Sequence, residues 1–394
     1  MACCLDDTDC LQYNRKDCEK LQKTRLYPLD AIRGVAACVV AFIWHYQHFA
    51  PQNGNPFGNV LGWGYRYGFM AVELFFMLSG FVMMYVYADK ISNHQICLKD
   101  YMKKRIIHFY PLMLITLIVV ALLQLYNEKT IGGWVVYQNN DLFHFVLNLL
   151  LMQSAVIDAG SSFNGPSWCI SVELFCYLLL YLVLRKSGKD MEKRWVYILG
   201  ILGGSLFIYY QGLGHPILNA LMARGTLCFF IGCVLHYLYR KIVDAKKEVL
   251  VGVGCLLFLV GAAFVYYFVS WRSVETAGSV QNCMIYLYGP CIIFIGLFVP
   301  GIKHILSIKP LTYLGNISFS IYMWHVPVQF TIMILLRIQG KTWDFSKPVY
   351  FLTYVASTLI VAIISYELYE KNMTKLLSGK SKINSNRKRR KKEE

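Results

Sequence analysis

Two histidines and an arginine interrupt the first long apolar stretch of the chain, LDAIRGVAACVVAFIWHYQHF at residues 29–49. Histidine gains or loses a proton near neutral pH, so His45 is suited to proton transfer. His48 follows three residues later, and two such rings can also ligate a metal, although the sequence offers no clear third and fourth ligand. Arg33 precedes His45 by a helical distance of about 18 Å, at about 1.5 Å per residue.

Four further ionisable residues stand within or at the edges of other apolar stretches, namely Glu73, Glu173, Arg224 and His325. Charged groups inside a membrane are costly, and they usually face a cavity or one another. The simplest interpretation is a structural ion pair, for instance Glu73 or Glu173 with Arg224. Because these residues and His45 belong to five different stretches at related depths, the alternative is one shared polar chamber.

A basic cluster precedes the third long apolar stretch, in the sequence YMKKRIIHFYP. It contains Lys103, Lys104, Arg105 and His108. Arg105 and His108 are three residues apart and therefore share one face of a helix. Such a cluster at a helix N-terminus can bind phosphate. The alternative is ordinary anchoring at the cytoplasmic surface of a membrane.

The composition predicts a membrane protein that is built from helices. Of the 394 residues 56% are hydrophobic and only 16% are charged, against about a quarter charged in soluble proteins. Apolar runs long enough to cross a bilayer recur along nearly the whole chain. The net charge of +16 does not indicate nucleic-acid binding, because the basic residues lie in loops and tails such as RKRRKKEE, which suits anionic lipid headgroups.

Ten membrane spans are expected from the apolar runs, and one shorter run at 143–157 is ambiguous. The ten expected spans are 31–49, 68–88, 106–125, 170–185, 195–211, 217–239, 249–270, 280–300, 311–336 and 348–369.

The distribution of Lys and Arg predicts the topology, because cytoplasmic loops are enriched in these residues. If 143–157 does not cross, 32 of the 39 Lys and Arg lie in cytoplasmic segments and only six lie outside. If it crossed, the basic loop RKSGKDMEKR would face outward. We therefore expect both termini in the cytoplasm and an interfacial or re-entrant helix at 143–157. The expected organisation is an N-terminal segment 1–28, a membrane domain 29–370 and a basic tail 371–394.

The thirteen cysteines do not suggest a disulfide framework. Four of them, Cys3, Cys4, Cys10 and Cys18, lie in the polar N-terminal segment, where we expect reduced thiols. Metal binding and lipidation are the alternatives for these four. Most of the other cysteines lie in apolar runs, where the side chain behaves as a small hydrophobe. No cleavable signal peptide is visible, so we expect the first span to act as a signal anchor.

Several blocks of the sequence are each weak signals alone, but their order and spacing are informative. The blocks are LDAIRGVAA leading to WH, AVELFFMLSGFVMMY, KKRIIHFYP, PSWCISVELFCY with Trp168, Ser171 and Glu173, ARGTLCFFIGCVL with Arg224, and LGNISFSIYMWHVP with His325. In this order of blocks the chain resembles the membrane acyltransferase-3 family over nearly all of residues 29–370. In the basic block, His108 stands where the family has a second arginine.

The resemblance implies an O-acyltransferase of the plasma membrane, with an acetyl group as the expected cargo. Family members carry acyl groups from cytosolic acyl-CoA to hydroxyls of carbohydrate on the far side of the membrane, and have ten spans with cytosolic ends. We expect a stand-alone enzyme without a fused SGNH domain. Its partners would be acyl-CoA as co-substrate, a surface or exported glycan and the lipid bilayer, with no bound cofactor, metal or nucleic acid.

The resemblance also assigns roles to the candidate residues. Arg105, with Lys103, Lys104 and His108, would hold the phosphates of coenzyme A, and His45 would be the general base for the sugar hydroxyl. A covalent acetyl-histidine is a second possible route. Glu73 or Glu173 would orient His45, and Arg224 or Ser171 would stabilise the oxyanion. His325 is a further catalytic candidate. Arg33 and Trp168 are expected to bind substrate.

A transporter or flippase for an amphipathic or anionic solute is the alternative from another functional class. The buried His, Glu and Arg residues would then form a proton relay or a solute site. The sequence shows no inverted repeat, and the basic cluster favours a phosphate-bearing donor.

Overall fold

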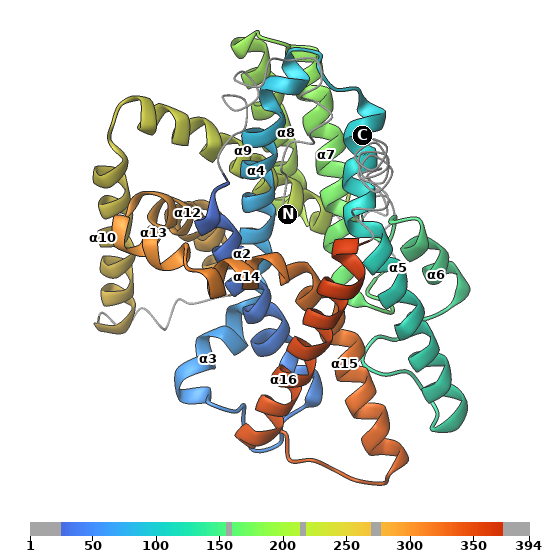
Figure 1. Cartoon of the computed structure of the whole chain (residues 1–394). Helices are drawn as coiled ribbons and strands as arrows, with labels where there is room; N and C mark the ends of the chain where they lie inside the picture. Colours follow the sequence, from blue (N-terminus) through green and yellow to red (C-terminus); the bar gives the residue numbers. More distant parts are fainter. Residues whose placement is uncertain (1–24, 155–159, 213–217, 269–276, 373–394) are drawn as a thin grey trace, which may run out of the picture.

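A computed structural model describes residues 25–154, 160–212, 218–268 and 277–372, and helices are the only regular elements within these ranges (Figure 1). The N-terminal cysteines and most of the basic tail lie outside the described residues. Apolar runs of this length form helices in a bilayer because a helix satisfies its own backbone hydrogen bonds. The expected all-α polytopic membrane protein is confirmed.

Nine helical stretches in the described ranges are long and apolar enough to cross a membrane. They are Tyr27–Phe49 with α2 (Tyr27–Cys38), Gly58–Ser92 with α3 (Gly58–Tyr67) and α4 (Ala71–Ser92), α5 (Leu98–Thr130), Gly165–Ser187 with α7 (Trp168–Ser187), α9 (Ala220–Asp244), Glu248–Val265 in α10 (Glu248–Phe268), Gly278–Phe298 with α11 (Ala277–Cys283) and α12 (Gly289–Phe298), α15 (Ser318–Ile338), and Pro348–Glu370 with α16 (Pro348–Ile364).

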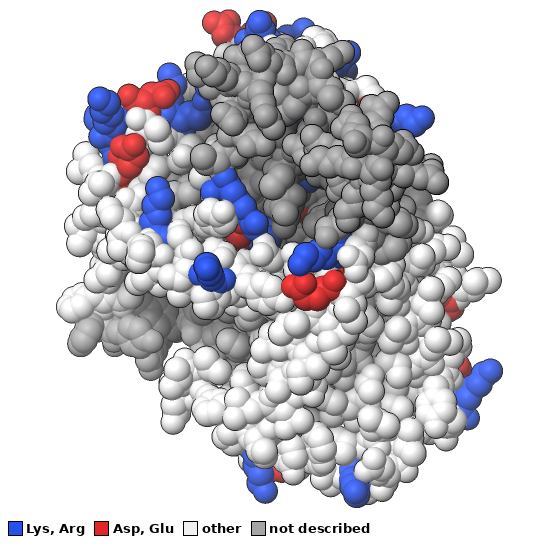
Figure 2. Space-filling view, in the orientation of Figure 1, with Lys and Arg blue, Asp and Glu red and all other residues white. Residues whose placement is uncertain are grey.

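The tenth expected span, at 195–211, coincides with α8 (Met191–Gln211), which is not among these nine and lies against α9. The molecular surface supports a membrane location. In Figure 2, charged side chains gather towards the upper part and the lower rim, and the broad surface between them is almost free of charge.

The ambiguous run at 143–157 contains only a short helix, α6 (Leu142–Leu149). Its eight residues extend about 12 Å, well short of a hydrocarbon core about 30 Å thick. Asp141 caps this helix, because its carboxylate accepts hydrogen bonds from the backbone N–H of His144 at 2.9 Å and from the His144 ring at 2.6 Å. These bonds lower the pKa of Asp141, so the cap is charged at neutral pH. The run does not form a span of its own within the described residues.

The expected span 311–336 is wrong at its start. The structure breaks the helix at Ile317, between α14 (Lys309–Asn316) and α15. The pair Gly315 and Asn316 precedes the break, and both residue types favour the end of a helix. Consequently His325 lies seven residues after the first residue of α15, and not 14 residues into a continuous span that begins at 311.

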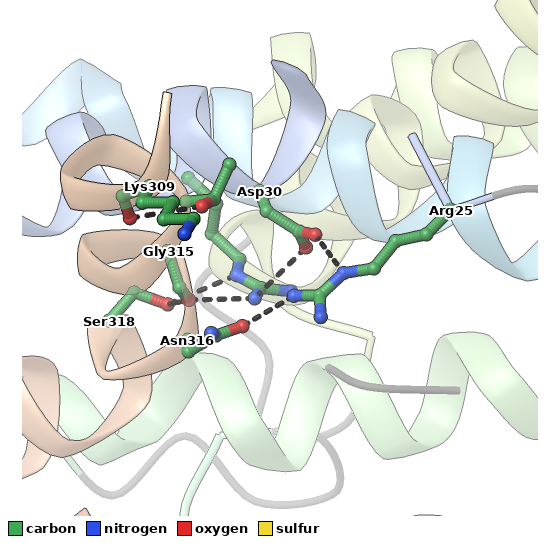
Figure 3. A network of polar contacts seen from close by, with 8 residues as sticks. Arg25, Asp30, Lys309, Gly315, Asn316 and Ser318 are labelled. Atoms are coloured by element: carbon green, nitrogen blue, oxygen red, sulfur yellow. Dashed lines mark hydrogen bonds and ion pairs between the residues drawn. The ribbon is translucent and has the colours of Figure 1, made fainter. Parts of the chain in front are cut away.

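A polar network joins α14 to the N-terminal part of α2 (Figure 3). Asp30 accepts a hydrogen bond at 2.6 Å from Arg25, which also donates to Asn316. Arg33 donates to the carbonyl of Gly315 at 2.8 Å and to Ser318 Oγ at 3.0 Å. Arg33, expected as a substrate ligand, therefore holds the junction of α14 and α15 against α2.

Helices α4 and α9 form the closest helix pair at the centre of the bundle (Figure 1). A Cβ atom at Gly80 would lie 1.9 Å from the carbonyl oxygen of Phe229, and one at Gly232 would lie 2.0 Å from that of Met77. Small residues let membrane helices approach to backbone contact. These two glycines therefore set the distance between α4, which carries Glu73, and α9.

Candidate active site

His45 lies where the first membrane helix departs from α-helical geometry. A π-helical segment, Val39–Trp44, follows α2, and His45 begins a 3₁₀ segment that ends at Phe49. Such irregular turns are frequent at functional sites, because they rotate the following side chains relative to a regular helix. Here the irregularity presents His45 to the fully buried His325 of α15.

The two imidazole rings are joined by a hydrogen bond. Nδ1 of His45 lies 3.0 Å from Nε2 of His325, and the ring centroids are 4.8 Å apart. On the other side, Nδ1 of His325 lies 2.6 Å from the carbonyl oxygen of Tyr322. A carbonyl oxygen only accepts, so the hydrogen-bond network places a proton on Nδ1 of His325.

This assignment determines which ring nitrogen of His45 carries the proton when both rings are neutral. Nε2 of His325 must then accept, so Nδ1 of His45 is the donor, and Nε2 of His45 carries a lone pair. The His45 side chain is partly exposed. This arrangement can act as a general base, with a reactive nitrogen defined by two successive hydrogen bonds.

Gln329 holds the backbone at this point. Its Nε2 donates to the carbonyl oxygen of His45 at 2.8 Å, and its Oε1 lies 3.0 Å from Nδ1 of His48. The rings of His45 and His48 are 5.0 Å apart. Across the described ranges, no group of three or more His, Cys, Asp or Glu side chains is placed to hold a metal ion.

Tyr322 connects the histidine pair to the beginning of α7. Its hydroxyl donates to the carbonyl oxygen of Pro166 at 2.9 Å, and Cys169 Sγ lies 3.3 Å from the same hydroxyl. The ring of Tyr322 is 5.8 Å from that of His325. The start of α7 and the second turn of α15 therefore meet beside the candidate base.

A second polar cluster surrounds Glu173, one turn after Cys169 on α7. The carboxylate accepts hydrogen bonds from Ser79 and Tyr177. The guanidinium of Arg105 lies 6.0 Å from the centre of the Tyr177 ring and donates to the Tyr87 hydroxyl at 2.7 Å. This cluster brings a carboxylate and a buried cation to the same part of the bundle.

The basic residues at the start of α5 do not all face this cluster. Arg105 is only 4% exposed, and the His108 ring stacks on Phe319 at 5.9 Å. Lys103 is exposed and Lys104 is half-buried. Consecutive helical residues point in directions about 100° apart, so Arg105 and His108 share an inward face and Lys103 points away from it.

Glu73 and Arg224 form an ion pair, which is the centre of a third polar cluster. Glu73 is 1% exposed, and its Oε1 lies 3.5 Å from Nε of Arg224 and accepts a hydrogen bond from Gln281 at 2.6 Å. The Arg224 guanidinium also lies over the ring of Trp168, 5.3 Å from its centre. Ser171 donates to the carbonyl oxygen of Trp168 at 2.8 Å.

The structure thus separates the predicted chamber into three clusters, centred on His45, Glu173 and Glu73. The sequence predicts an acidic partner for His45, whereas the structure places His325 there. Arg224 and Ser171, expected as oxyanion donors, are bonded elsewhere. The pairings arise from contacts between helices far apart in the chain, which residue type and depth do not encode.

Sequence reasoning missed several residues of the site, because it searched for ionisable groups. Ser79, Tyr177 and Tyr322 have common side chains for a membrane helix, and no local signal marks them. Gln329 carried a usable signal, because an amide four residues after His325 in an apolar helix requires a partner.

Comparisons with known proteins show the family of the chain. A family model described as an acyltransferase domain, of the acyltransferase-3 type, matches residues 26–367. The putative peptidoglycan O-acetyltransferase YrhL of Bacillus subtilis is 24% identical over 89% of this chain and 55% of its own length. Peptidoglycan O-acetyltransferase OatA of Listeria monocytogenes is 23% identical over 87% of this chain and 54% of its own length.

The acyltransferase MdmB of Streptomyces mycarofaciens is 34% identical over 41% of each chain. The chain spans about half the length of the curated relatives it matches. No solved structure matches it. Because the family model covers most of the described helices, from α2 into the last span, the chain belongs to the acyltransferase-3 family.

Proposed function

We propose that this protein is an O-acetyltransferase that moves an acetyl group from acetyl-CoA to a hydroxyl of a surface or exported glycan. Its family and its resemblance to two proteins named as peptidoglycan O-acetyltransferases support this function. The observation that carries it is the hydrogen-bonded chain from the Tyr322 carbonyl through His325 to His45, which leaves a lone pair on Nε2 of His45.

In the proposed reaction, Nε2 of His45 takes the proton of the acceptor hydroxyl as its oxygen attacks the thioester carbonyl. A C–O bond forms, and the tetrahedral intermediate then collapses with cleavage of the C–S bond. His45 returns its proton to the departing thiolate, so the products are the acetyl ester and free coenzyme A. His325 stabilises the transient imidazolium by accepting the Nδ1 hydrogen bond.

The donor enters this scheme from the end of the bundle where α5 begins. Arg105 and His108 face the interior there, and the Phe109 ring stacks over Tyr177 at 6.3 Å. A buried guanidinium suits a phosphate, and aromatic walls suit the apolar part of the pantetheine arm. The excess of Lys and Arg in the loops at this end supports a cytosolic donor site.

Transport is a weaker explanation of the same residues. A proton relay needs a group that passes the proton onward. The histidine chain ends at the Tyr322 backbone carbonyl, which accepts a hydrogen bond and does not conduct a proton. This termination favours a fixed, oriented base.

Incubation of the purified full chain in lipid nanodiscs with radiolabelled acetyl-CoA and N-acetylglucosamine oligosaccharides tests the proposal. We expect label in the oligosaccharide, a mass increase of one acetyl group per modified unit, and release of the label by mild base. Intact acetyl-CoA, or an unmodified acceptor after the donor is consumed, would overturn the proposed function.

A further inference from the structure

A polar cavity lies beside the start of α7, away from the contacts assigned to the acetyl transfer. Its volume is about 150 Å³. One water needs only about 10–15 Å³ of such volume, so the cavity has room for roughly ten to fifteen water-sized groups, about the size of one sugar ring with its hydroxyls. Its lining includes Asn148, Gln153, Ser154, Ser162, Trp168 and Leu221.

Gln153 gives this cavity an unused hydrogen-bond acceptor. Its side chain is only 4% exposed, and its Nε2 donates to the carbonyl oxygen and the Oγ of Ser167 at 3.1 and 3.2 Å. These bonds fix the amide orientation. Its Oε1 is buried and accepts no hydrogen bond from the residues that the structure describes. Buried polar atoms are rarely left unpaired, so Oε1 requires a donor from a ligand or from water.

The neighbouring amide is already engaged. Nδ2 of Asn148 donates to the His144 carbonyl at 2.9 Å and to Ser162 Oγ at 2.8 Å, and its Oδ1 accepts from Ser167 at 3.2 Å. The cavity walls are therefore held in place by internal bonds, and Gln153 Oε1 is the buried acceptor left over.

One short segment of chain separates the cavity from the histidine pair. A Cβ atom at Gly165, which lines the cavity, would lie 2.4 Å from the ring of Tyr137. That ring packs against His48 at 5.7 Å. The adjacent Pro166 carbonyl accepts the Tyr322 hydroxyl. Residues 165 and 166 therefore lie between the cavity and the side chains of Tyr137 and Tyr322, which contact His48 and His325.

We propose that the cavity binds the sugar unit of the acceptor glycan that adjoins the acetylated unit; this subsite rests on the function proposed above. A sugar hydroxyl donates to Gln153 Oε1, and the Trp168 side chain forms part of the wall around the sugar ring. The described lining contains no charged side chain, which suits an uncharged carbohydrate better than an anionic solute.

Two variants test the subsite independently. Gln153→Met removes the acceptor, and Ser161→Phe fills the cavity from the exposed Ser161, a lining residue that takes no part in the bonds described above. Gln138→Met is the matched control, because Gln138 lies in the same connection between α5 and α7 but is exposed and outside the cavity lining.

Initial rates are measured with the full chain in nanodiscs, acetyl-CoA, and either N-acetylglucosamine or its tetrasaccharide as acceptor. We expect the native protein to prefer the tetrasaccharide. Both cavity variants should raise the KM for the tetrasaccharide at least tenfold, towards that of the monosaccharide, with the KM for acetyl-CoA and the kcat unchanged. Gln138→Met should behave as the native protein.

Two negative outcomes are distinguishable. If the native protein acetylates neither sugar, the proposed function fails and the subsite fails with it. If the native protein is active and Ser161→Phe leaves the tetrasaccharide KM unchanged, the subsite alone is refuted. Ser161→Phe still tests the subsite if Gln153→Met fails to fold, because it preserves the hydrogen bonds from Gln153 to Ser167.

Discussion

Nδ1 of His45 and Nε2 of His325 lie 3.0 Å apart, although 280 residues separate them in the chain. The second nitrogen of His325 is fixed by the carbonyl oxygen of Tyr322 at 2.6 Å. The candidate base is therefore oriented by a neutral ring and a backbone group, where many enzymes use a carboxylate. The following predictions test what this contact does.

Replacing His45 with glutamine should remove the base while keeping a polar side chain of similar length. Loss of a general base typically slows a reaction by about a hundredfold to ten-thousandfold. We expect acetyl transfer by His45→Gln to fall by that factor, with thermal unfolding close to native. His48→Gln is the control and should lose little activity, because the ring nitrogen of His48 hydrogen-bonds Gln329 and not His45. Near-native turnover by His45→Gln would remove His45 from the mechanism.

His325 should act through His45, and a double-mutant comparison reveals this. His325→Ala leaves the His45 ring without its partner, so we expect kcat to fall by at least tenfold with the donor KM unchanged. Residues that act as a unit are not additive, so His45→Ala with His325→Ala should be no slower than His45→Ala alone. His325→Gln, which still offers an acceptor to His45, should recover part of the rate. Additive losses would show independent roles.

Arg105 should contribute to donor binding more than its lysine neighbours do. Loss of one charge-assisted hydrogen bond costs about 1.5–3 kcal/mol, or roughly tenfold to a hundredfold in affinity. We expect Arg105→Ala to raise the KM for acetyl-CoA by that factor, whereas Lys103→Ala at the exposed position should change it little. His108→Arg should retain or improve donor binding above pH 7.

Arg105 also donates to Tyr87, so stability must be measured in parallel. Arg105→Lys keeps the charge and should preserve folding better than alanine does. If the folded Arg105 variants use acetyl-CoA with native affinity, the residue serves the packing of α5 and not the donor.

The sequence predicted the spans and the candidate residues better than it predicted the partners of those residues. His45 was visible because a titratable group in an apolar run is unusual, and Arg105 was visible because it belongs to a basic cluster at the start of a helix. Their contacts were not, because which helices pack together depends on tertiary structure. The break at Ile317 was available in principle from Gly315 and Asn316, but the continuous apolar pattern around it outweighed that signal.

The orientation of the chain remains a prediction from its charges. A reporter fused after residue 190, in the basic loop between α7 and α8, should report the cytoplasm. Reporters at residues 135 and 160 should both report the outside, because α6 is too short to cross between them. The fusions at 135 and 160 control for each other, because they differ only in the position of the reporter. Opposite locations for these two would mean that the intervening chain crosses the membrane, and the orientation of every later helix would reverse.

Gly80 should tolerate no side chain, because a Cβ atom there would lie 1.9 Å from the carbonyl oxygen of Phe229 on α9. Alanine must therefore push α4 away from α9, and overpacking of this kind costs about 1–3 kcal/mol or more. We expect Gly80→Ala to lower the thermal unfolding temperature in detergent and to reduce acetyl transfer, because α4 also carries the Ser79 that hydrogen-bonds Glu173. Gly254→Ala on α10 is the control, since a Cβ atom at Gly254 meets nothing within 4 Å, and alanine is the better helix former. Equal unfolding temperatures for the two variants would mean that α4 and α9 pack less closely than the described contact requires.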